Sequence, residues 1–416
     1  MIRRWSIALL AALAALAGAV AAVAAEPVTI TWLVYGSTEQ FEKVLEQFHA
    51  ENPDIRVEFD VATGEYTSTV AVRAVAGALP DVVILNWGTF RPVKEGYFLD
   101  LTPFIERDGL DIKDYLAQTN LVEYQGRING LPWGTFMPLL FYNKDIFDQA
   151  GVAYPNAEWD WTDLENAAVR TVRRGSNGAV ERYAFNNPLL DYEYGWRNFV
   201  AQNGGAQYTE DFSRTLIDAP EAVEAISYLV ELTERELLPP PGMSLDFLNW
   251  DYSMNIRRPT PILTAFAKEQ PDWNWGAEIL PKGKVRAAGL NTLVVGINAD
   301  TKHPEESWRL VKYLSSPDAA KQFAFLGRAM PSHAGAYTDP EFFRAWSEMV
   351  GQDLTHLTQT LPIQMANPFW IPVHEKEGDI MVNHWRPLGS RLLREGAEPR
   401  AFLENVARTV NAILAQ

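Results

Sequence analysis

The stretch that decides the fold reads YQGRINGLPWGTFMPLLFYNKDIF and covers residues 124–147. It begins with a glycine-rich turn around Gly126 and Gly130. The apolar run Phe136–Tyr142 follows, which is too short for an independent helix and is bounded by turn signals. This pattern predicts one buried strand that crosses from one part of the molecule to another.

A short helix is expected directly after that strand. Asn143-Lys144-Asp145 predicts its start, with Asp145 as the N-cap, and Gly151 predicts its end. The order of turn, Leu-Pro-Trp, strand, Tyr-Asn-Lys-Asp and Ala-Gly resembles a segment of the extracellular solute-binding proteins that supply ABC importers, in their maltose-binding-protein-like, sugar-binding class. The resemblance implies an α/β two-lobe periplasmic binding protein fold of type II. In that fold each lobe is a mainly parallel sheet flanked by helices, and the ligand cleft lies between the lobes.

Residues 1–25 have the layout of a secretory signal peptide. Arg3 and Arg4 precede an Ala/Leu/Val run that ends in small residues suited to cleavage after Ala24 or Ala25. A single membrane anchor is the alternative, but the alanine-rich run is only weakly apolar. We therefore expect export and removal of this segment.

The chain has no cysteine, which excludes disulfides, thiolate metal sites, cysteine nucleophiles and a lipid-modified anchor cysteine. A periplasmic, monomeric protein is expected. Removing Arg3 and Arg4 changes the formal net charge from −17 to −19, which argues against nucleic acid and anionic membranes as partners. With 25 of 416 residues removed, the mature chain still exceeds what one core normally holds, so two domains are expected.

Three β-rich segments near the amino end alternate with amphipathic segments. The expected strands are Val28–Tyr35, Ile55–Phe59 and Pro80–Leu85. This alternation predicts a doubly wound lobe with a parallel sheet. Ligands of such sheets bind beyond the carboxyl ends of the strands. The turns that start at Tyr35 and Asn86 are therefore expected to face the ligand.

Later segments extend the resemblance over nearly the whole mature chain. Thr162 is expected to cap a helix, with Glu165 completing a capping box, and the last helix is expected over 398–415. Gly289–Trp308 resembles the return of the chain to the first lobe. Asn255–Pro261 departs from the family pattern and carries Arg257 and Arg258 instead of a Gly-Lys-x-Ala-Met strand.

The resemblance also implies the lobe boundaries. The first lobe is expected to comprise residues 26–135 and 292–335, and the second lobe residues 136–291 and 336–416. Three short crossings between lobes are implied near residues 135–138, 290–292 and 331–337, which would permit a hinge rotation.

The sequence offers little for catalysis. Asp160 with Glu165, or Asp191 with Glu193, could flank a glycosidic bond. The first pair also fits a helix cap, and the second lies in an aromatic loop. The six histidines show no paired metal-ligand spacing, and no phosphate loop or nucleophile elbow is present. We therefore expect neither an enzyme nor a bound metal or cofactor.

With catalysis and metal binding set aside, the remaining feature is aromatic residues beside hydrogen-bonding groups. A sugar-binding site needs both, flat rings for the C–H faces of the sugar and polar groups for its hydroxyls. Trp32, Trp308 and Trp385 are expected in cores. The candidate ligand-binding residues, several of them implied by the resemblance, are Tyr35, Glu39, Asn86, Trp87, Trp133, Asp191, Tyr194, Trp196, Asn291, Arg328 and Trp370.

The implied function is capture of a carbohydrate, a mono- or oligosaccharide or a polyol, for the membrane permease subunits of an ABC importer. On the same scaffold the alternative is another polar solute, such as a glycerol phosphoester or an osmolyte, which would require a cationic cluster or an aromatic cage. The alternative of another class is a secreted carbohydrate-active enzyme. Arg328 has its own alternative, an ion pair with a surface carboxylate.

Replacing either Trp87 or Trp370 by alanine is expected to weaken ligand binding and to leave the fold intact. Loss of a stacking face should cost about 1 to 3 kcal/mol, or roughly tenfold to a hundredfold in affinity. Titration followed by intrinsic tryptophan fluorescence measures this, with circular dichroism as the control for folding. Unchanged affinity in both variants would show that neither ring lies in the site.

Overall fold

The computed structural model describes residues 26–116, 123–191, 195–243, 251–259, 272–366, 368–370 and 374–416. The expected signal peptide and Tyr194 lie outside these ranges, and the side chains of Trp87 and Trp370 are likewise outside what the structure describes. Within the described ranges, no helix combines the length and apolar character that crossing a bilayer requires.

The first sheet confirms the predicted parallel arrangement of the amino-terminal strands. The first strand pairs in parallel with the second and the third, so it lies between them. The order is β13-β12-β3-β1-β2, with β6 paired to β12. The bounds are β1 (Val28–Val34), β2 (Ile55–Val61), β3 (Val82–Leu85), β6 (Leu131–Phe136), β12 (Ala288–Ile297) and β13 (Pro368–Trp370).

Helices pack against this sheet to form the first lobe. The first of them buries Phe41, Val44, Leu45 and Phe48, which recur with the helical period. The bounds are α2 (Glu39–Glu51), α3 (Tyr66–Val75), α4 (Phe90–Lys94), α5 (Thr102–Asp108), α12 (Pro304–Leu314) and α13 (Pro317–Phe325), with the short turns η1 (Trp87–Thr89) and η2 (Ile112–Asp114) and the hairpin β4 (Glu123–Tyr124) and β5 (Arg127–Ile128).

The apolar run after Trp133 is two strands, where one was predicted. The first, β6, ends at Phe136, and the next, β7 (Leu139–Asn143), belongs to a different sheet. Pro138 explains the break, because it has no N–H to donate to a ladder and its φ is fixed. The chain therefore crosses between sheets at residues 137–138.

The second sheet is mixed and has the order β11-β7-β10-β9-β8. Its central strand runs parallel to β9 and antiparallel to β7. The bounds are β8 (Arg173–Arg174), β9 (Val180–Phe185), β10 (Tyr252–Arg257) and β11 (Trp275–Glu278).

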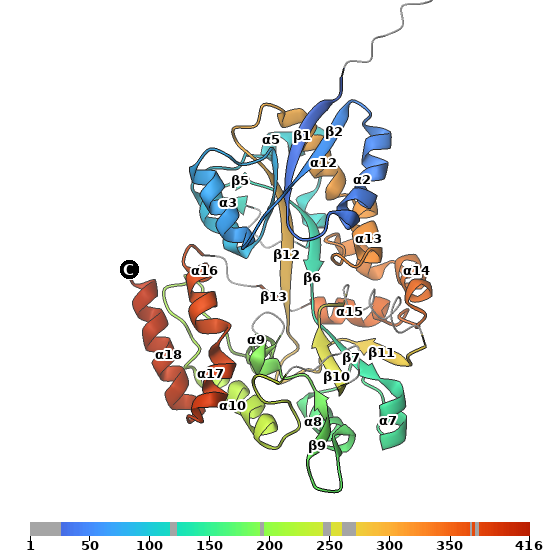
Figure 1. Ribbon diagram of the computed structural model, residues 1–416, viewed down its shortest axis with the longest axis vertical. Coiled ribbons are helices and arrows are strands. Elements are labelled where there is room, and N and C mark those ends of the chain that lie inside the picture. The colour runs from blue at the N-terminus through green and yellow to red at the C-terminus, as the bar shows by residue number, and fades with distance from the viewer. Residues whose placement is uncertain are drawn as a thin grey trace, which may run out of the picture.

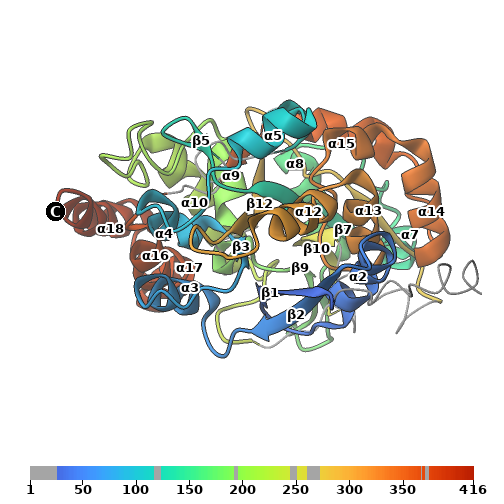
Figure 2. The same cartoon turned by 90° about the horizontal axis from the view of Figure 1, so that it is seen from above.

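Helices flank the second sheet on opposite sides, with α14 and α15 on one side of the molecule and α16 to α18 on the other (Figures 1 and 2). The expected carboxyl-terminal helix is confirmed as α18, which buries Leu403, Val406 and Val410. The bounds are α7 (Lys144–Ala150), α8 (Trp161–Thr171), α9 (Trp196–Gln202), α10 (Pro220–Glu234), α14 (Pro340–Val350), α15 (Leu357–Met365), α16 (Glu377–Ile380), α17 (Leu388–Glu395) and α18 (Pro399–Leu414), with η3 (Pro188–Leu190), η5 (Ala334–Thr338) and the π-helical turn η6 (Met381–Trp385).

The long strand β12 connects the two lobes (Figure 1). Its first residue, Ala288, packs in the core of the second lobe, whereas Leu293 to Val295 pack in the core of the first. Trp32 and Trp308 lie in the core of the first lobe, and Trp385 lies in the core of the second lobe. Each is fully buried, which confirms the prediction for all three.

Two helix caps differ from the prediction. Asn143 rather than Asp145 caps α7, because its side chain accepts a hydrogen bond from the Ile146 amide. Asp160 rather than Thr162 caps α8. A capping residue needs extended backbone, which Asp160 has, with φ −115° and ψ −175°.

Asp160 builds a capping box with Asp163. Its carboxylate accepts hydrogen bonds from the amides of Thr162 and Asp163, at 2.7 and 3.1 Å. The Asp163 carboxylate accepts one from the Asp160 amide at 3.1 Å. We expect Asp160→Ala to lower the free energy of unfolding by about 1 kcal/mol.

Urea unfolding followed by circular dichroism measures this effect. Thr162→Ala is the matched control, because Thr162 is already helical and alanine is the better helix former. A larger loss of stability in Thr162→Ala than in Asp160→Ala would contradict the observed cap.

Candidate functional site

The carboxyl ends of the parallel strands in both sheets point toward the crossing between the lobes. In the first lobe, Leu85 at the end of β3 pairs with Val294, whereas Val82 at the start of β3 pairs with Ile297. The carboxyl end of β3 therefore lies nearer the start of β12. In the second lobe, the last residue of β10, Arg257, pairs with Leu139, immediately after the crossing. Ligands bind beyond such ends in open α/β sheets, so both lobes present their binding edges to one region.

We define the interlobe junction by five residues: Tyr35, Phe136, Arg258, Asn291 and Arg328. Tyr35 directly follows β1, and its ring meets that of Tyr66 edge to face at 4.9 Å. The hydroxyl of Tyr66 donates a hydrogen bond of 2.8 Å to the carbonyl of Ile84 in β3. The Tyr35 ring is therefore supported by a side chain that is itself anchored to the sheet.

Arg328 lies against the same ring. Its guanidinium carbon is 4.6 Å from the ring centre of Tyr35 and 4.7 Å from that of Phe41. Its Nη2 donates to the Tyr35 carbonyl at 3.2 Å. Cation–π contacts of this kind are worth about 0.5 to 2 kcal/mol, so the guanidinium is held in place by both contacts.

Two glycines explain why Arg328 lies there. Gly327 has φ +77° and ends α13, a conformation that side chains other than glycine rarely adopt. Gly134 lies so close to Ala329, which follows Arg328, that an added Cβ would be 2.6 Å from the Cβ of Ala329. This close approach lets Thr135 and Met330 exchange backbone hydrogen bonds of 2.8 and 3.0 Å, which holds Arg328 beside the end of β6.

Arg258 reaches the junction from the second lobe. It directly follows β10, and its guanidinium carbon lies 4.9 Å from the ring centre of Phe136. Phe136 pairs with Asn291 across β6 and β12, and directly opposed residues of an antiparallel pair have side chains on the same face. The face beneath Arg258 therefore carries an aromatic ring and an amide.

The electrostatics of the junction are positive. Burial lowers the pKa of Arg328, the neighbouring Tyr35 opposes that shift, and the positive charge of Arg258 lowers the pKa further. Two guanidiniums from different lobes therefore repel one another here, where like charges in a partly buried setting interact more strongly than in water.

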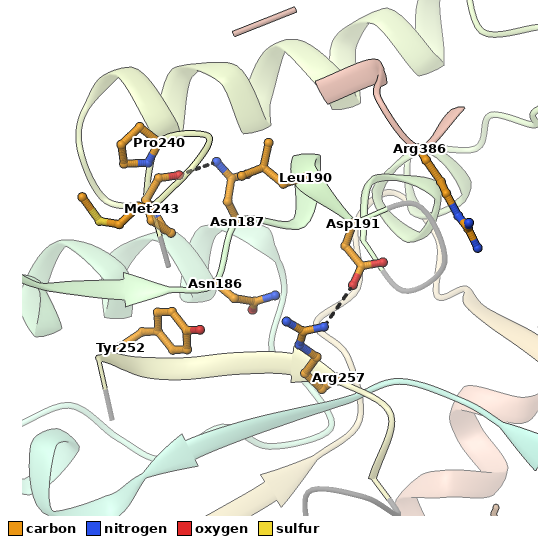
Figure 3. Close-up of a pocket in the computed structure, with 10 residues that line it drawn as sticks. Asn186, Asn187, Leu190, Asp191, Pro240, Met243, Tyr252, Arg257 and Arg386 are labelled. Atoms are coloured by element: carbon orange, nitrogen blue, oxygen red, sulfur yellow. Dashed lines mark hydrogen bonds and ion pairs between the residues drawn. The ribbon is translucent and has the colours of Figure 1, made fainter. Parts of the chain in front are cut away.

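A cavity of about 430 Å³ lies at the same edge of the second sheet (Figure 3). It is lined by Asn186, Asn187, Leu190, Asp191, Pro239, Pro240, Met243, Tyr252, Arg257 and Arg386. Asp191 and Arg257 form an ion pair at 3.6 Å across it. Partly exposed pairs of this kind contribute about 0 to 1 kcal/mol to stability.

Two buried asparagines form one wall of this cavity. Asn187 donates to the Pro239 carbonyl at 2.9 Å and accepts from the Leu189 amide at 3.0 Å, so it fixes the turn η3. Asn186 accepts from the Ile256 amide at 2.8 Å and joins the ends of β9 and β10. These contacts hold Asp191 and Arg257 at the carboxyl edge.

The structure brings four of the sequence candidates to these two regions. Tyr35, Asn291 and Arg328 lie at the junction, and Asp191 lines the cavity. Arg328 does not form the ion pair that was its alternative interpretation: no carboxylate of the described chain lies within ion-pair distance of it. The nearby positive charge of Arg258 lowers its pKa.

The remaining candidates have other places. Glu39 is exposed at the start of α2 and forms an ion pair with Lys43 at 2.8 Å. Asn86 caps η1 by accepting a hydrogen bond from the Gly88 amide at 2.9 Å. Trp133 is fully buried, 4.6 Å from Phe323 between ring centres, and Trp196 is 1% exposed. Both rings are therefore covered by other parts of the protein in this structure.

The candidates Trp87, Tyr194 and Trp370 cannot be placed by their side chains, which lie outside the described part of the chain. The backbone of Trp370 pairs with Leu290 in β12.

Sequence reasoning missed Phe136, Asn186, Asn187, Arg258 and Arg386. The one available signal in the sequence is the Arg257-Arg258 pair, which departs from the family pattern.

The carboxylates considered for catalysis have structural contacts. Asp160 caps α8, and Glu165 forms an ion pair with Arg235 at 2.6 Å. Asp191 pairs with Arg257, and Glu193 lies outside the described residues. Within the described chain, no three His, Cys, Asp or Glu side chains gather as a metal site would require.

Comparison with known proteins gives a family match. Residues 35–321 match the family model described as bacterial extracellular solute-binding protein. A binding protein of Brucella abortus is 26% identical over 435 residues, covering 100% of this chain and 99% of the relative. An arabinooligosaccharide-binding protein of Halalkalibacterium halodurans is 24% identical over 346 residues, covering 78% of this chain and 73% of the relative.

A solved structure shares the fold. The ABC substrate-binding protein of Listeria monocytogenes in complex with cycloalternan superposes with a TM-score of 0.80 at 23% identity. The match covers 94% of this chain and 100% of that one.

Proposed function

Because this chain belongs to the bacterial extracellular solute-binding proteins, we propose that it captures a carbohydrate and delivers it to the membrane permease subunits of an ABC importer. The ligand is a mono- or oligosaccharide or a polyol. The protein acts as a periplasmic monomer after cleavage of residues 1–25.

The observation that carries this proposal is the composition of the interlobe junction. It combines the rings of Tyr35 and Phe136 with the donors of Arg258 and Arg328 and the amide of Asn291. Aromatic faces with polar groups around them suit the two kinds of surface on a sugar. The adjacent cavity adds Asp191 and Arg257 as an acceptor and a donor.

The relatives support the carbohydrate class. The Halalkalibacterium protein is named for arabino-oligosaccharides, and the Listeria structure holds a cyclic oligosaccharide. A cavity of about 430 Å³ falls within the range of small-ligand sites.

We further propose the lobe boundaries 26–135 with 292–335, and 136–291 with 336–416. The crossings at residues 135–138, 290–292 and 331–337 then act as the hinge. A ligand that contacts both lobes favours their closed arrangement only through its higher affinity for that arrangement. The permease recognises the closed form.

A thermal-shift screen of sugars and polyols on the protein lacking residues 1–25 tests this function. A ligand that binds only the folded state stabilises it by mass action and therefore raises the melting temperature. At a ligand concentration of a hundred times the Kd, the free energy of unfolding increases by about 2.7 kcal/mol. We expect at least one carbohydrate to raise the melting temperature in a concentration-dependent manner. A complete screen of mono-, di- and oligosaccharides and polyols without a shift would contradict the proposal.

Product analysis separates binding from the alternative of a carbohydrate-active enzyme. The oligosaccharide that gives the largest shift is incubated with the protein and then examined by mass spectrometry. We expect it to be recovered intact. Release of shorter sugars, absent from a heated control, would favour the enzyme.

A further inference from the structure

We infer that the ligand carries a negatively charged group, a carboxylate or a phosphate on a sugar or polyol, which binds between Arg258 of the second lobe and Arg328 of the first. The inference rests on the proposed function and specifies its ligand class.

The first step concerns the ion-pair partners of the two guanidiniums. Among the described residues, no Asp or Glu forms an ion pair with Arg258 or Arg328. Other arginines of the chain do have such partners, as Arg309 does with Asp54 at 2.7 Å and Arg235 with Glu165 at 2.6 Å.

The sequence has 53 Asp and Glu against 36 Lys and Arg, so acidic side chains are in excess. Other described arginines, such as Arg182 and Arg286, also have no ion-pair partner among the described residues. What distinguishes Arg258 and Arg328 is their position, since they come from different lobes and lie beside the rings of the interlobe junction.

The second step is that the two charges are held close together. Arg258 is held over Phe136 by its contact with the ring. Arg328 is fixed beside the end of β6 by the Thr135–Met330 hydrogen bonds. Phe136 directly follows Thr135 in β6, so the two guanidiniums lie beside the same end of one strand, and the positive charge of Arg258 lowers the pKa of Arg328.

The third step is that Arg328 is only partly solvated. Its Nε is buried and finds no hydrogen-bond acceptor among the described residues. A buried donor on a charged group without an acceptor is unfavourable. A carboxylate or phosphate supplies acceptors in the geometry of the guanidinium fork and also removes the repulsion between the two cations.

A neutral sugar would satisfy only part of this requirement. Its hydroxyls can accept hydrogen bonds from the guanidiniums, but they leave both positive charges uncompensated. The neighbouring cavity offers Asp191, Arg257 and Arg386 as hydrogen-bonding groups for the hydroxyls of the same ligand.

Matched ligand pairs that differ in one charged group test the inference on the unaltered protein. Glucuronate is compared with glucose, galacturonate with galactose, glucose 6-phosphate with glucose, and glycerol 3-phosphate with glycerol, each by isothermal titration calorimetry. We expect the acidic member of at least one pair to bind about tenfold or more tightly than its neutral partner. Preference for a uronate identifies a carboxylate, and preference for a phosphate ester identifies a phosphate.

Variants then assign the preference to the two arginines. Arg258→Gln and Arg328→Gln are each expected to reduce the ratio of acidic to neutral affinity by about tenfold. Arg56→Gln is the matched control, because it makes the same change in net charge at the amino end of β2, where Arg56 is exposed and pairs with Glu58 at 3.1 Å. Circular dichroism checks that the partly buried Arg328 variant folds, and Arg258→Gln provides the test from the other lobe.

The outcomes separate this inference from the proposed function. Selective loss of the acidic ligand in Arg258→Gln, with Arg56→Gln unchanged, supports it. Equal binding of the acidic and neutral members of every pair overturns the charged-ligand inference and leaves carbohydrate capture standing. If no member of any pair binds and the thermal-shift screen is also negative, carbohydrate capture fails and the inference fails with it.

Discussion

The pairing of β12 with β6 is the constraint on which the rest of the structure depends. It places Asn291 opposite Phe136 and Thr292 opposite Thr135 at the point where the chain leaves the first sheet. Because β12 begins in one core and ends in the other, the pairing fixes the carboxyl ends of both sheets toward the same region. Phe136 and Asn291 lie in this ladder, and Arg328 is placed by the Met330 segment bonded to its edge, whereas Tyr35 follows β1 and Arg258 follows β10.

The junction combines positive charge with aromatic support. The chain as a whole is acidic, yet the point where the lobes meet carries two guanidiniums. Both are supported by aromatic rings, and rings support a cation without neutralising it. Positive charge is therefore kept at the junction, where the proposed ligand would contact both lobes.

The sequence predicted the first lobe well because its signals are local. Phe41, Val44, Leu45 and Phe48 recur with helical spacing, and the β-rich runs before and after them alternate with helices, so element types and parallel pairing follow from periodicity. The break at Pro138 and the cap at Asp160 were missed because they depend on which sheet a residue joins and on backbone conformation two residues from the expected position.

The site was harder to predict from the sequence than the fold. Trp133 has the residue type of a sugar platform, and only packing against Phe323 shows that its faces are covered. Arg258 and Arg328 come from different lobes and lie 70 positions apart in the sequence, so no local pattern predicts that they are near one another.

The central claim is that one ligand binds to groups of both lobes at the junction and thereby draws the lobes together. Small-angle X-ray scattering of the protein with and without a saturating ligand found by thermal shift tests it most directly. The account predicts a smaller radius of gyration with ligand, while the circular dichroism spectrum stays the same, because the lobes move as bodies about their crossings. An unchanged scattering curve with a ligand shown to be bound would contradict it.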